Sequence, residues 1–330
     1  MPEAVSLFSG SLSSSISTEM AIQHSAVNRV VVLTFRSPFF DGYEQVRELA
    51  RRLWPESQFR SKSIKRETDN IAEFADGSDS PYCTGCRVAL LETGKEFLDR
   101  TGADFLVSGD TVGSDGEAGP DRLEELDRRA GVEGMVFRPL AGDGGYDFLP
   151  NLDSLPDIDG ASSDDLMGIA RELGLGSENQ FISARDRCKL TNSNYRRRLE
   201  DLISEDSFNV NDLRLLDFDS YYKIPPNTKV VLGRNSEEKR ELHNYFLPRD
   251  LRFYLPTREG PMALVRSDLD EESDGKLDEL VGLAARITVA KSQVGERDRV
   301  PVNYRFEHDS ETYRIEVPPL EREKLRELSV

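Results

Sequence analysis

Residues 4–18, AVSLFSGSLSSSIST, decide the fold expected for the N-terminal half of the chain. An apolar run with Val5, Leu7 and Phe8 predicts a strand, and a glycine with small hydroxyl residues separates it from a helical pattern. Such a turn directs several main-chain N–H groups toward one point, where the helix dipole favours an anion. The stretch therefore predicts a strand–turn–helix unit suited to a phosphate, although serine-rich turns are also ordinary helix caps.

The alternation of strands and helices continues through the first half of the chain. Strand patterns occupy residues 29–35, 104–108 and 134–140, and helical patterns occupy residues 15–25, 43–53, 87–98 and 121–130. This order predicts a parallel sheet covered by helices on both faces. Residues 141–163, rich in glycine, aspartate and proline, predict a long loop.

A different pattern begins near residue 217. Strand-like segments follow one another without regular crossover helices, at residues 229–232, 251–255, 262–265, 302–306 and 312–317. We therefore expect an α/β protein: a Rossmann-like parallel sheet with a second, smaller α+β domain. The predicted domains are residues 1–178, a connecting helical segment at 179–216 that carries the third cysteine, and residues 217–330.

The net charge and the search for targeting segments restrict the classes of protein that we expect. The 330 residues carry a formal net charge of −18, which argues against broad attraction to nucleic acid. A second interpretation is adaptation to high salt, in which case only local basic patches are informative. The arginine-rich basic residues and the scattered acidic residues favour this second interpretation. We see no secretory signal and no membrane span, so we expect a cytoplasmic protein without a membrane partner.

The chain has three cysteines, too few for a disulfide framework, and Cys83 and Cys86 form a Cys-x-x-Cys pair. That spacing is typical of redox or metal chemistry. A structural zinc site and inert buried thiols remain open as alternatives. A zinc site would need a fourth ligand, for which the three histidines His24, His243 and His308 are few candidates.

Several motifs together resemble the PP-loop ATP pyrophosphatase superfamily. Residues 9–14, SGSLSS, resemble its Ser-Gly-Gly-x-Asp-Ser signature at the end of the first strand. Segments that resemble its tRNA-thiolating branch (thiouridine synthetases and 2-thiouridylases) follow in the same order: 82–87 (YCTGCR), 102–110 (GADFLVSGD), 131–140 (GVEGMVFRPL), 187–192 (RCKLTN) and 195–199 (YRRRL). Residues 229–235 and 258–261 resemble the NFACT-type RNA-binding domain that follows the catalytic domain in one group of these proteins.

The resemblance implies an adenine nucleotide alpha hydrolase-like fold that uses ATP and magnesium. It implies that the nucleotide lies near Ser9, Gly10, Ser11, Ser13, Ser14 and Gly109. Ser11 and Ser13 depart from the family, because they replace its second glycine and its aspartate. A hydroxyl is a poor substitute for a carboxylate as a magnesium ligand, so the sequence predicts a phosphate loop of altered chemistry.

In the chemistry that the resemblance implies, ATP adenylates a uridine carbonyl oxygen and sulfur then displaces AMP. Cys83, Cys86 and Cys188 match the cysteine positions of the thiolating branch, as catalytic residues or as ligands of an iron–sulfur cluster. Three thiolates suit a cluster with one open iron, and equally a persulfide pair with a resolving thiol. We expect Cys86 to lie at the N-terminus of the helix at residues 87–98. A cysteine near a helix N-terminus has its thiolate form favoured.

Basic residues indicate where RNA is bound. The densest cationic cluster contains Arg196, Arg197 and Arg198, with Tyr195 beside them for base stacking. In the C-terminal domain the candidates are Arg234, Asn235 and Arg258, with Arg252 and Tyr254 nearby. A solvated helix face and an ordinary turn with surface arginines are the alternatives.

The sequence therefore favours a tRNA-modification protein that transfers sulfur to a tRNA uridine with ATP, aided by a sulfur-donor protein. Two alternatives stay open. One is a catalytically silent relative that binds RNA or protein as a scaffold. The other is an iron–sulfur enzyme that handles thiolated bases without ATP. The sequence does not fix the oligomeric state.

Overall fold

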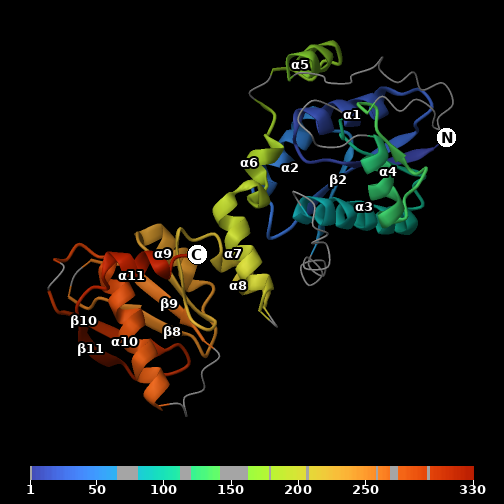
Figure 1. Cartoon of the computed structure of the whole chain (residues 1–330). Coiled ribbons are helices and arrows are strands. Elements are labelled where there is room, and N and C mark those ends of the chain that lie inside the picture. The colour runs from blue at the N-terminus through green and yellow to red at the C-terminus, as the bar shows by residue number, and fades with distance from the viewer. Residues whose placement is uncertain are drawn as a thin grey trace. The chain divides into compact units, whose positions relative to one another are not determined.

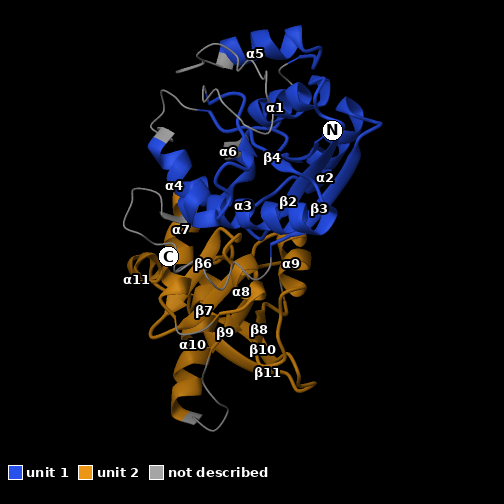
Figure 2. Cartoon of the chain, turned by 90° about the vertical axis from the view of Figure 1, so that its right-hand side faces the viewer, with its two compact units in different colours: residues 1–192 blue, residues 193–330 orange. Residues whose placement is uncertain are grey.

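The computed structural model describes most of the chain in two compact units, Met1–Asn192 and Ser193–Val330 (Figure 2). The described residues are 2–64, 81–111, 120–141, 163–177, 180–205, 208–257, 259–267, 274–295 and 298–330. The division falls inside the segment 179–216 that the sequence assigns to a connection. Most of the expected loop at 141–163 lies outside the described residues, as does Arg258.

A five-stranded parallel sheet forms the centre of the first unit. Its order is β3-β2-β1-β4-β5, and its strands are β1 (Glu3–Leu7), β2 (Arg29–Arg36), β3 (Gln58–Ser63), β4 (Phe105–Val107) and β5 (Val136–Phe137). This is the order of a doubly wound sheet, in which the connections change direction between β1 and β4. Ligands of such sheets bind outside the carboxyl ends of the strands at this point. The predicted Rossmann-like fold is confirmed.

Helices cover both faces of this sheet (Figure 1). They are α1 (Leu12–Gln23), α2 (Tyr43–Leu53), α3 (Pro81–Thr101), α4 (Pro120–Ala130), α5 (Ser163–Glu172), α6 (Ala184–Arg187) and the 3-10 helix η3 (Lys189–Thr191). Val31 and Leu33 of β2 join Leu91 of α3 in one core, whereas Val32 joins Ile16 of α1 in the other. The β-branched run of β2 is buried on both sides because its alternate residues face different helix layers.

The second unit is built on a six-stranded antiparallel sheet of order β11-β10-β8-β9-β7-β6. Its strands are β6 (Ser220–Ile224), β7 (Thr228–Gly233), β8 (Leu251–Tyr254), β9 (Met262–Arg266), β10 (Val300–Phe306) and β11 (Tyr313–Val317). Its helices are α7 (Ser193–Ile203), α8 (Val210–Leu215), α9 (Ser236–His243), α10 (Asp274–Ala290) and α11 (Arg322–Glu327). Helix α10 packs on one face, where Ala284 meets Val230 and Phe253. The predicted second α+β domain is confirmed.

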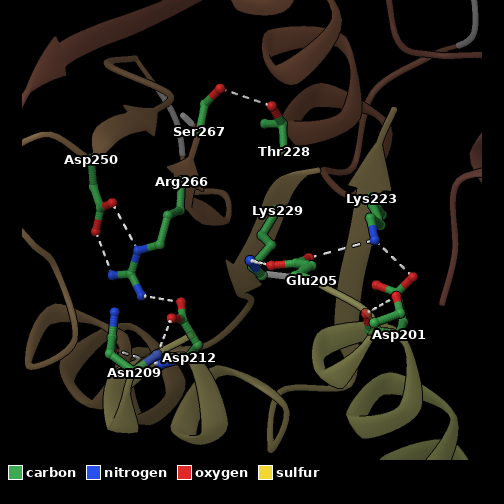
Figure 3. Close-up of polar contacts among 11 residues, drawn as sticks. Asp201, Glu205, Asn209, Asp212, Lys223, Thr228, Lys229, Asp250, Arg266 and Ser267 are labelled. Atoms are coloured by element: carbon green, nitrogen blue, oxygen red, sulfur yellow. Dashed lines mark hydrogen bonds and ion pairs between the residues drawn. The ribbon is translucent and has the colours of Figure 1, made fainter. Parts of the chain in front are cut away.

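Ion pairs attach the helical segment α7–α8 to this sheet (Figure 3). Lys229 of β7 contacts Glu205 at 2.5 Å, and both side chains are 7% exposed. The other pairs join Lys223 to Asp201 at 2.8 Å and Arg266 to Asp212 at 2.7 Å. Lysine and arginine side chains of the sheet thus pair with carboxylates of the segment that precedes it. The helices α7 and α8 and the sheet therefore form one unit.

Helix α3 and the strands β3 and β6 differ from the sequence prediction, which expected no strand at Ser220–Ile224. Helix α3 begins at Pro81 rather than near Arg87, so Cys83 and Cys86 lie in its first two turns and Cys86 does not open it. Proline suits the first position of a helix, where its missing N–H costs no hydrogen bond. Strand β3 was not expected, because its residues are mostly polar.

Among the described helices, none combines the length and the apolar character that a membrane span requires.

Candidate functional site

The turn between β1 and α1 has the backbone that the sequence indicates. Gly10 has φ +85°, and a Cβ at this position would lie 3.0 Å from Ile182 and 3.1 Å from Val46. Ser11 is the N-cap of α1 with an ordinary φ of −72°, so a serine fits at this position without strain. The turn therefore requires the glycine at residue 10 but not a second glycine at residue 11.

The serine hydroxyls of this turn form a connected network. Ser9 Oγ donates to Ser11 Oγ at 3.0 Å and to Ser14 Oγ at 3.1 Å, and Ser11 Oγ lies 3.3 Å from Ser13 Oγ. Ser11 Oγ also accepts the main-chain N–H of Ser14 at 3.2 Å. The hydroxyls are thus held together at the start of α1, as in an N-cap, and an anion placed there would compete with these bonds.

Gly109 packs directly against this helix N-terminus. A Cβ on Gly109 would lie 2.6 Å from both Cα and N of Ser14 and 2.8 Å from the carbonyl carbon of Ser13. Since no side chain fits in that space, the loop after β4 reaches the serine turn only because residue 109 is glycine. The structure brings Gly109 and Ser9–Ser14 together at the carboxyl ends of β1 and β4.

Asp110, the next residue, joins a network of buried ion pairs that the sequence did not single out. Its carboxylate contacts Arg87 at 2.6 Å, Arg138 at 3.0 Å and the hydroxyl of Ser108 at 2.8 Å. Arg138 is 6% exposed and also pairs with Asp127 through two bonds of 2.6 and 2.7 Å. The network joins the loop after β4 to α3, α4 and the end of β5.

The electrostatics of Asp110 follow from these partners. Burial raises the pKa of its carboxyl group, but Arg87 and Arg138 lower it further, so the pKa lies below the ordinary value. Asp110 is therefore an anion at neutral pH whose oxygens are already bonded. The signal that could have found it is its position, immediately after Gly109 at the carboxyl edge of the sheet.

Cys188 is placed near the serine turn by the segment that precedes it. Ile182 N donates to Gly10 O at 2.9 Å, and the buried guanidinium of Arg187 bonds Ser9 O and, at 2.7 Å, Asp41 O. Burial lowers the pKa of Arg187 despite the nearby Asp41. Cys188 itself pairs with Phe40 as an antiparallel bridge. Its half-buried thiol thus lies at the same edge of the sheet.

The Cys-x-x-Cys pair lies on α3, whose first turns reach that edge as well. Arg87, the neighbour of Cys86, contacts Asp110 beside Gly109. Cys86 is half-buried and forms no disulfide with a described residue, and the side chain of Cys83 lies outside the described part. The segment of Cys188 is thus bonded to the serine turn, and Arg87, next to Cys86, joins α3 to the loop after β4 beside that turn.

The described residues do not fit a magnesium site. Hydroxyls line the turn, the carboxylate of Asp110 is bonded to two arginines, and no three described His, Cys, Asp or Glu side chains are arranged to hold a metal ion. Magnesium prefers carboxylate oxygens and water, so no step is assigned to it. An iron–sulfur cluster bound by all three thiolates would include Cys83, whose side chain lies outside the described residues.

The arginines of α7 are divided between the surface and the interior. Arg198 is 7% exposed and donates to the carbonyls of Leu216, Phe218, Asp219 and Val330. Arg197 is exposed and Arg196 is half-buried. The guanidinium of Arg198 therefore stabilises the fold and is not a candidate for contacts with RNA.

Arg234 and Asn235 also have structural partners. Arg234 pairs with Asp219 at 2.8 Å and with Glu238 at 3.2 Å. Asn235 is the N-cap of α9, and its side chain accepts the N–H groups of Glu237 and Glu238. Exposed ion pairs are weak, so Arg234 remains available to a ligand.

The C-terminal part of the chain is similar to a known RNA-binding domain. Residues 221–328 match the family model of the NFACT protein RNA binding domain. No curated protein matches the chain.

Three solved structures resemble parts of the chain. A 4-thiouridine synthetase in complex with RNA and bound ATP is 22% identical at a TM-score of 0.35, covering 53% of this chain and 52% of that one. A predicted subunit of a tRNA methyltransferase from Methanocaldococcus jannaschii is 16% identical at a TM-score of 0.33, covering 58% and 96%. NMN synthetase from Francisella tularensis is 10% identical at a TM-score of 0.34, covering 65% and 83%.

Proposed function

We propose that this chain is an RNA-modification protein that transfers sulfur to a tRNA uridine in the cytoplasm. One observation carries the proposal: Ile182 and Arg187 bond the main chain of the serine turn, and the next residue is Cys188. A thiol and a turn suited to a phosphate thus belong to the same edge of a doubly wound sheet. The match of residues 221–328 to an RNA-binding domain supports RNA as the partner.

Each part of this edge has a role in the proposed reaction. Gly10 and Gly109 let the main chain approach the nucleotide, and Ser9, Ser11, Ser13 and Ser14 offer hydroxyl donors to its phosphates. The uridine carbonyl oxygen attacks the α-phosphorus of ATP and pyrophosphate leaves. The outer sulfur of a persulfide on one cysteine, supplied by a donor protein, then attacks the same uridine carbon, and AMP leaves with the oxygen. A second cysteine thiol attacks the cysteine sulfur of the resulting mixed disulfide, so that the thiouridine leaves and the two cysteines become joined in a disulfide. An external thiol reduces that disulfide before the next turnover.

The chain's own residues position the sulfur. Arg187 fixes the segment of Cys188 by donating to the carbonyls of Ser9 and Asp41. Asp110 fixes the first turns of α3 through Arg87, next to Cys86. A persulfide on one cysteine and a resolving thiol on another would need no metal ion.

Nucleoside analysis of bulk tRNA from a deletion strain tests the proposal. We expect loss of 2-thiouridine or 4-thiouridine, restored by the wild-type chain but not by Cys86→Ala or Cys188→Ala. Asp186→Asn, an exposed change two residues before Cys188, serves as the control and should restore the nucleoside. An unchanged nucleoside profile in the deletion strain would contradict the proposal.

A second candidate is a silent scaffold that binds RNA without turnover. It is favoured by the serine network, in which the hydroxyls bond one another and no carboxylate stands at residue 13. Titration of the full chain with ATP, with magnesium and with a chelator, separates the two candidates. The scaffold predicts weak affinity for ATP under both conditions, whereas the sulfur transferase must bind ATP.

A further inference from the structure

The two faces of the antiparallel sheet carry different residues where β8, β10 and β11 meet. Leu251, Phe253 and Val302 are buried on the face that α10 covers. Because side chains alternate along a strand, the neighbours of these residues point to the other face. We call it the outer face, and its residues on these strands are Arg252, Tyr254, Pro301, Asn303, Arg305, Arg314 and Glu316.

The strand register aligns these residues in three rows across the sheet, one of which contains Pro301 and Glu316. Tyr254 of β8 pairs with Asn303 of β10, which pairs with Arg314 of β11. Arg252 pairs with Arg305 in the adjacent row. Neighbouring strands lie about 4.8 Å apart, so the row with Tyr254 spans roughly 10 Å. That length fits one or two nucleotides of an extended strand.

The outer face becomes accessible toward β11. Val231 and Leu264, on the same face of β7 and β9, are fully buried. In contrast, Tyr254, Asn303 and Arg305 are half-buried, and Arg314 is exposed. The most accessible residues of the outer face therefore lie on β11, next to half-buried residues of β8 and β10.

Local contacts fix several of these side chains. Arg252 lies 4.6 Å from the ring centroid of Phe246 and donates to Glu307 at 2.8 Å. Asn303 Nδ2 donates to Tyr254 Oη at 3.3 Å. The hydrogen bond from Asn303 holds the tyrosine ring in place, which reduces the entropy lost when a base stacks on it.

The charge of this surface is opposite to that of the chain. Its residues include three arginines and one glutamate, whereas the chain has 43 basic and 61 acidic residues. Arg314 makes no ion pair within the described residues. Arg305 donates to the carbonyl of Asp309 at 3.2 Å and approaches Glu307 at 3.9 Å, contacts that are weak at a partly exposed position. These two cations are therefore available to phosphates in a chain that otherwise repels a polyanion.

We propose that the outer face of β8, β10 and β11 binds an unpaired segment of RNA. Tyr254 stacks on a base, Asn303 bonds a base edge, and Arg305 and Arg314 contact phosphates. A flat sheet surface with an aromatic ring and cations suits splayed single-stranded bases rather than a duplex. The proposal rests on the proposed function, because it places the RNA that the function requires.

Binding of the full chain to bulk tRNA from the deletion strain and to a fluorescent oligouridylate tests this surface. We expect Arg305→Ala/Arg314→Ala to weaken binding about tenfold or more. It should also reduce the slope of log K against log salt by roughly 0.7 for each lost phosphate contact. Tyr254→Leu should weaken binding between about 5- and 150-fold with an unchanged slope. Tyr254→Phe keeps the ring but loses its bond from Asn303, so it should weaken binding less than Tyr254→Leu does.

Two control variants test whether RNA binds elsewhere on the second unit. Arg240→Ala removes an exposed arginine of α9 and should leave affinity unchanged. Tyr313→Ala removes the last ring of the Phe253–Tyr304–Tyr313 stack, which faces the α10 side, and should also have little effect. Thermal melting confirms that each variant is folded, and the exposed Arg314→Glu provides a charge reversal that does not disturb the core.

Three outcomes overturn the proposal. Wild-type affinity in the double arginine variant, or a loss confined to Tyr313→Ala, would place the RNA elsewhere while leaving the proposed function intact. A wild-type chain that binds neither tRNA nor oligouridylate would remove the proposed function together with this surface. Loss in the arginine and Tyr254→Leu variants alone supports the outer face.

Discussion

Asp110 shows how one residue can hold the candidate site together. Its carboxylate, which is 15% exposed beside Gly109, accepts bonds from two arginines that belong to α3 and to the end of β5. Removing one member of a buried ion pair leaves the other charges without compensation. The stability of this edge of the sheet therefore depends on Asp110 more than on the individual serines of the turn.

We predict that Asp110→Asn lowers the free energy of unfolding by about 3 kcal/mol. The pKa of Asp110 is lowered in the folded state, so its contribution is present above the unfolded pKa of about 4 and is lost as the pH falls through the folded pKa. Urea unfolding from pH 7 down to pH 3 measures this, and the variant should lose less stability with acid. The exposed Asp99→Asn is the control. Equal acid sensitivity of Asp110→Asn and the wild type would contradict the prediction.

Gly109 gives a second test at the same scale. The Cβ of Gly109→Ala would lie 2.6 Å from the main chain of Ser14, so the loop or the helix must move. We expect a loss of about 1–3 kcal/mol in unfolding free energy, as for overpacking, and weaker nucleotide binding. Gly168→Ala in α5 has open space and should stabilise the protein by up to about 1 kcal/mol. Chemical denaturation compares the two, and similar values for both would contradict the predicted close packing.

At the scale of elements, α7 and α8 are attached to the antiparallel sheet by charge as well as by packing. Arg198 donates to a main-chain carbonyl across this junction. The charges of Lys229 and Arg266 are paired there with Glu205 and Asp212 (Figure 3). Such pairs cost desolvation, and they specify a unique arrangement more than they add stability. We therefore expect the stability of this junction to fall when one member of an ion pair is removed, and to fall much less when both members are replaced by apolar residues.

We predict that Lys229→Met lowers the unfolding free energy by about 3 kcal/mol, because it leaves the buried Glu205 with only the more distant Lys223, at 3.5 Å. The double variant Lys229→Met/Glu205→Leu should recover most of that loss. Lys324→Met breaks an exposed pair with Glu327 and should cost less than about 1 kcal/mol. A double-mutant cycle followed by urea denaturation measures the coupling, and additive effects would show that the pair is not coupled.

At the scale of the whole molecule, the two units have separate cores and different sheets. The second unit begins at Ser193, and its first helices supply carboxylates to the sheet. A boundary placed at residue 217, where strand patterns begin, cuts through these ion pairs. The limits of a folding unit are therefore set by the partners of its buried charges as well as by its sheet.

We predict that a fragment of residues 193–330 unfolds in one cooperative thermal transition. A fragment of residues 217–330 should melt at a lower temperature or remain unfolded, because Lys223 and Lys229 lose Asp201 and Glu205 and Tyr221 becomes exposed. Circular dichroism compares the two melting temperatures. Equal values would show that α7 and α8 do not contribute to the folding of the sheet.

The sequence by itself determined the alternation of strands and helices, the two-domain order and the serine turn at the end of β1. These features depend on hydrophobic periodicity and on turn residues, which act within a few positions of one another. Strand β3 escaped prediction because its polar residues become a strand only by pairing with β2. Its conformation depends on a neighbour more than twenty residues away.

Only the tertiary structure decided the roles of individual charges. Asp110 meets Arg138 and Arg198 meets the carbonyl of Phe218, and both pairs join segments about twenty or more residues apart. A row of arginines in the sequence cannot show which member is buried, because burial depends on the elements that pack around it. The sequence thus placed the site and the domains, whereas long-range packing decided which side chains are free to act.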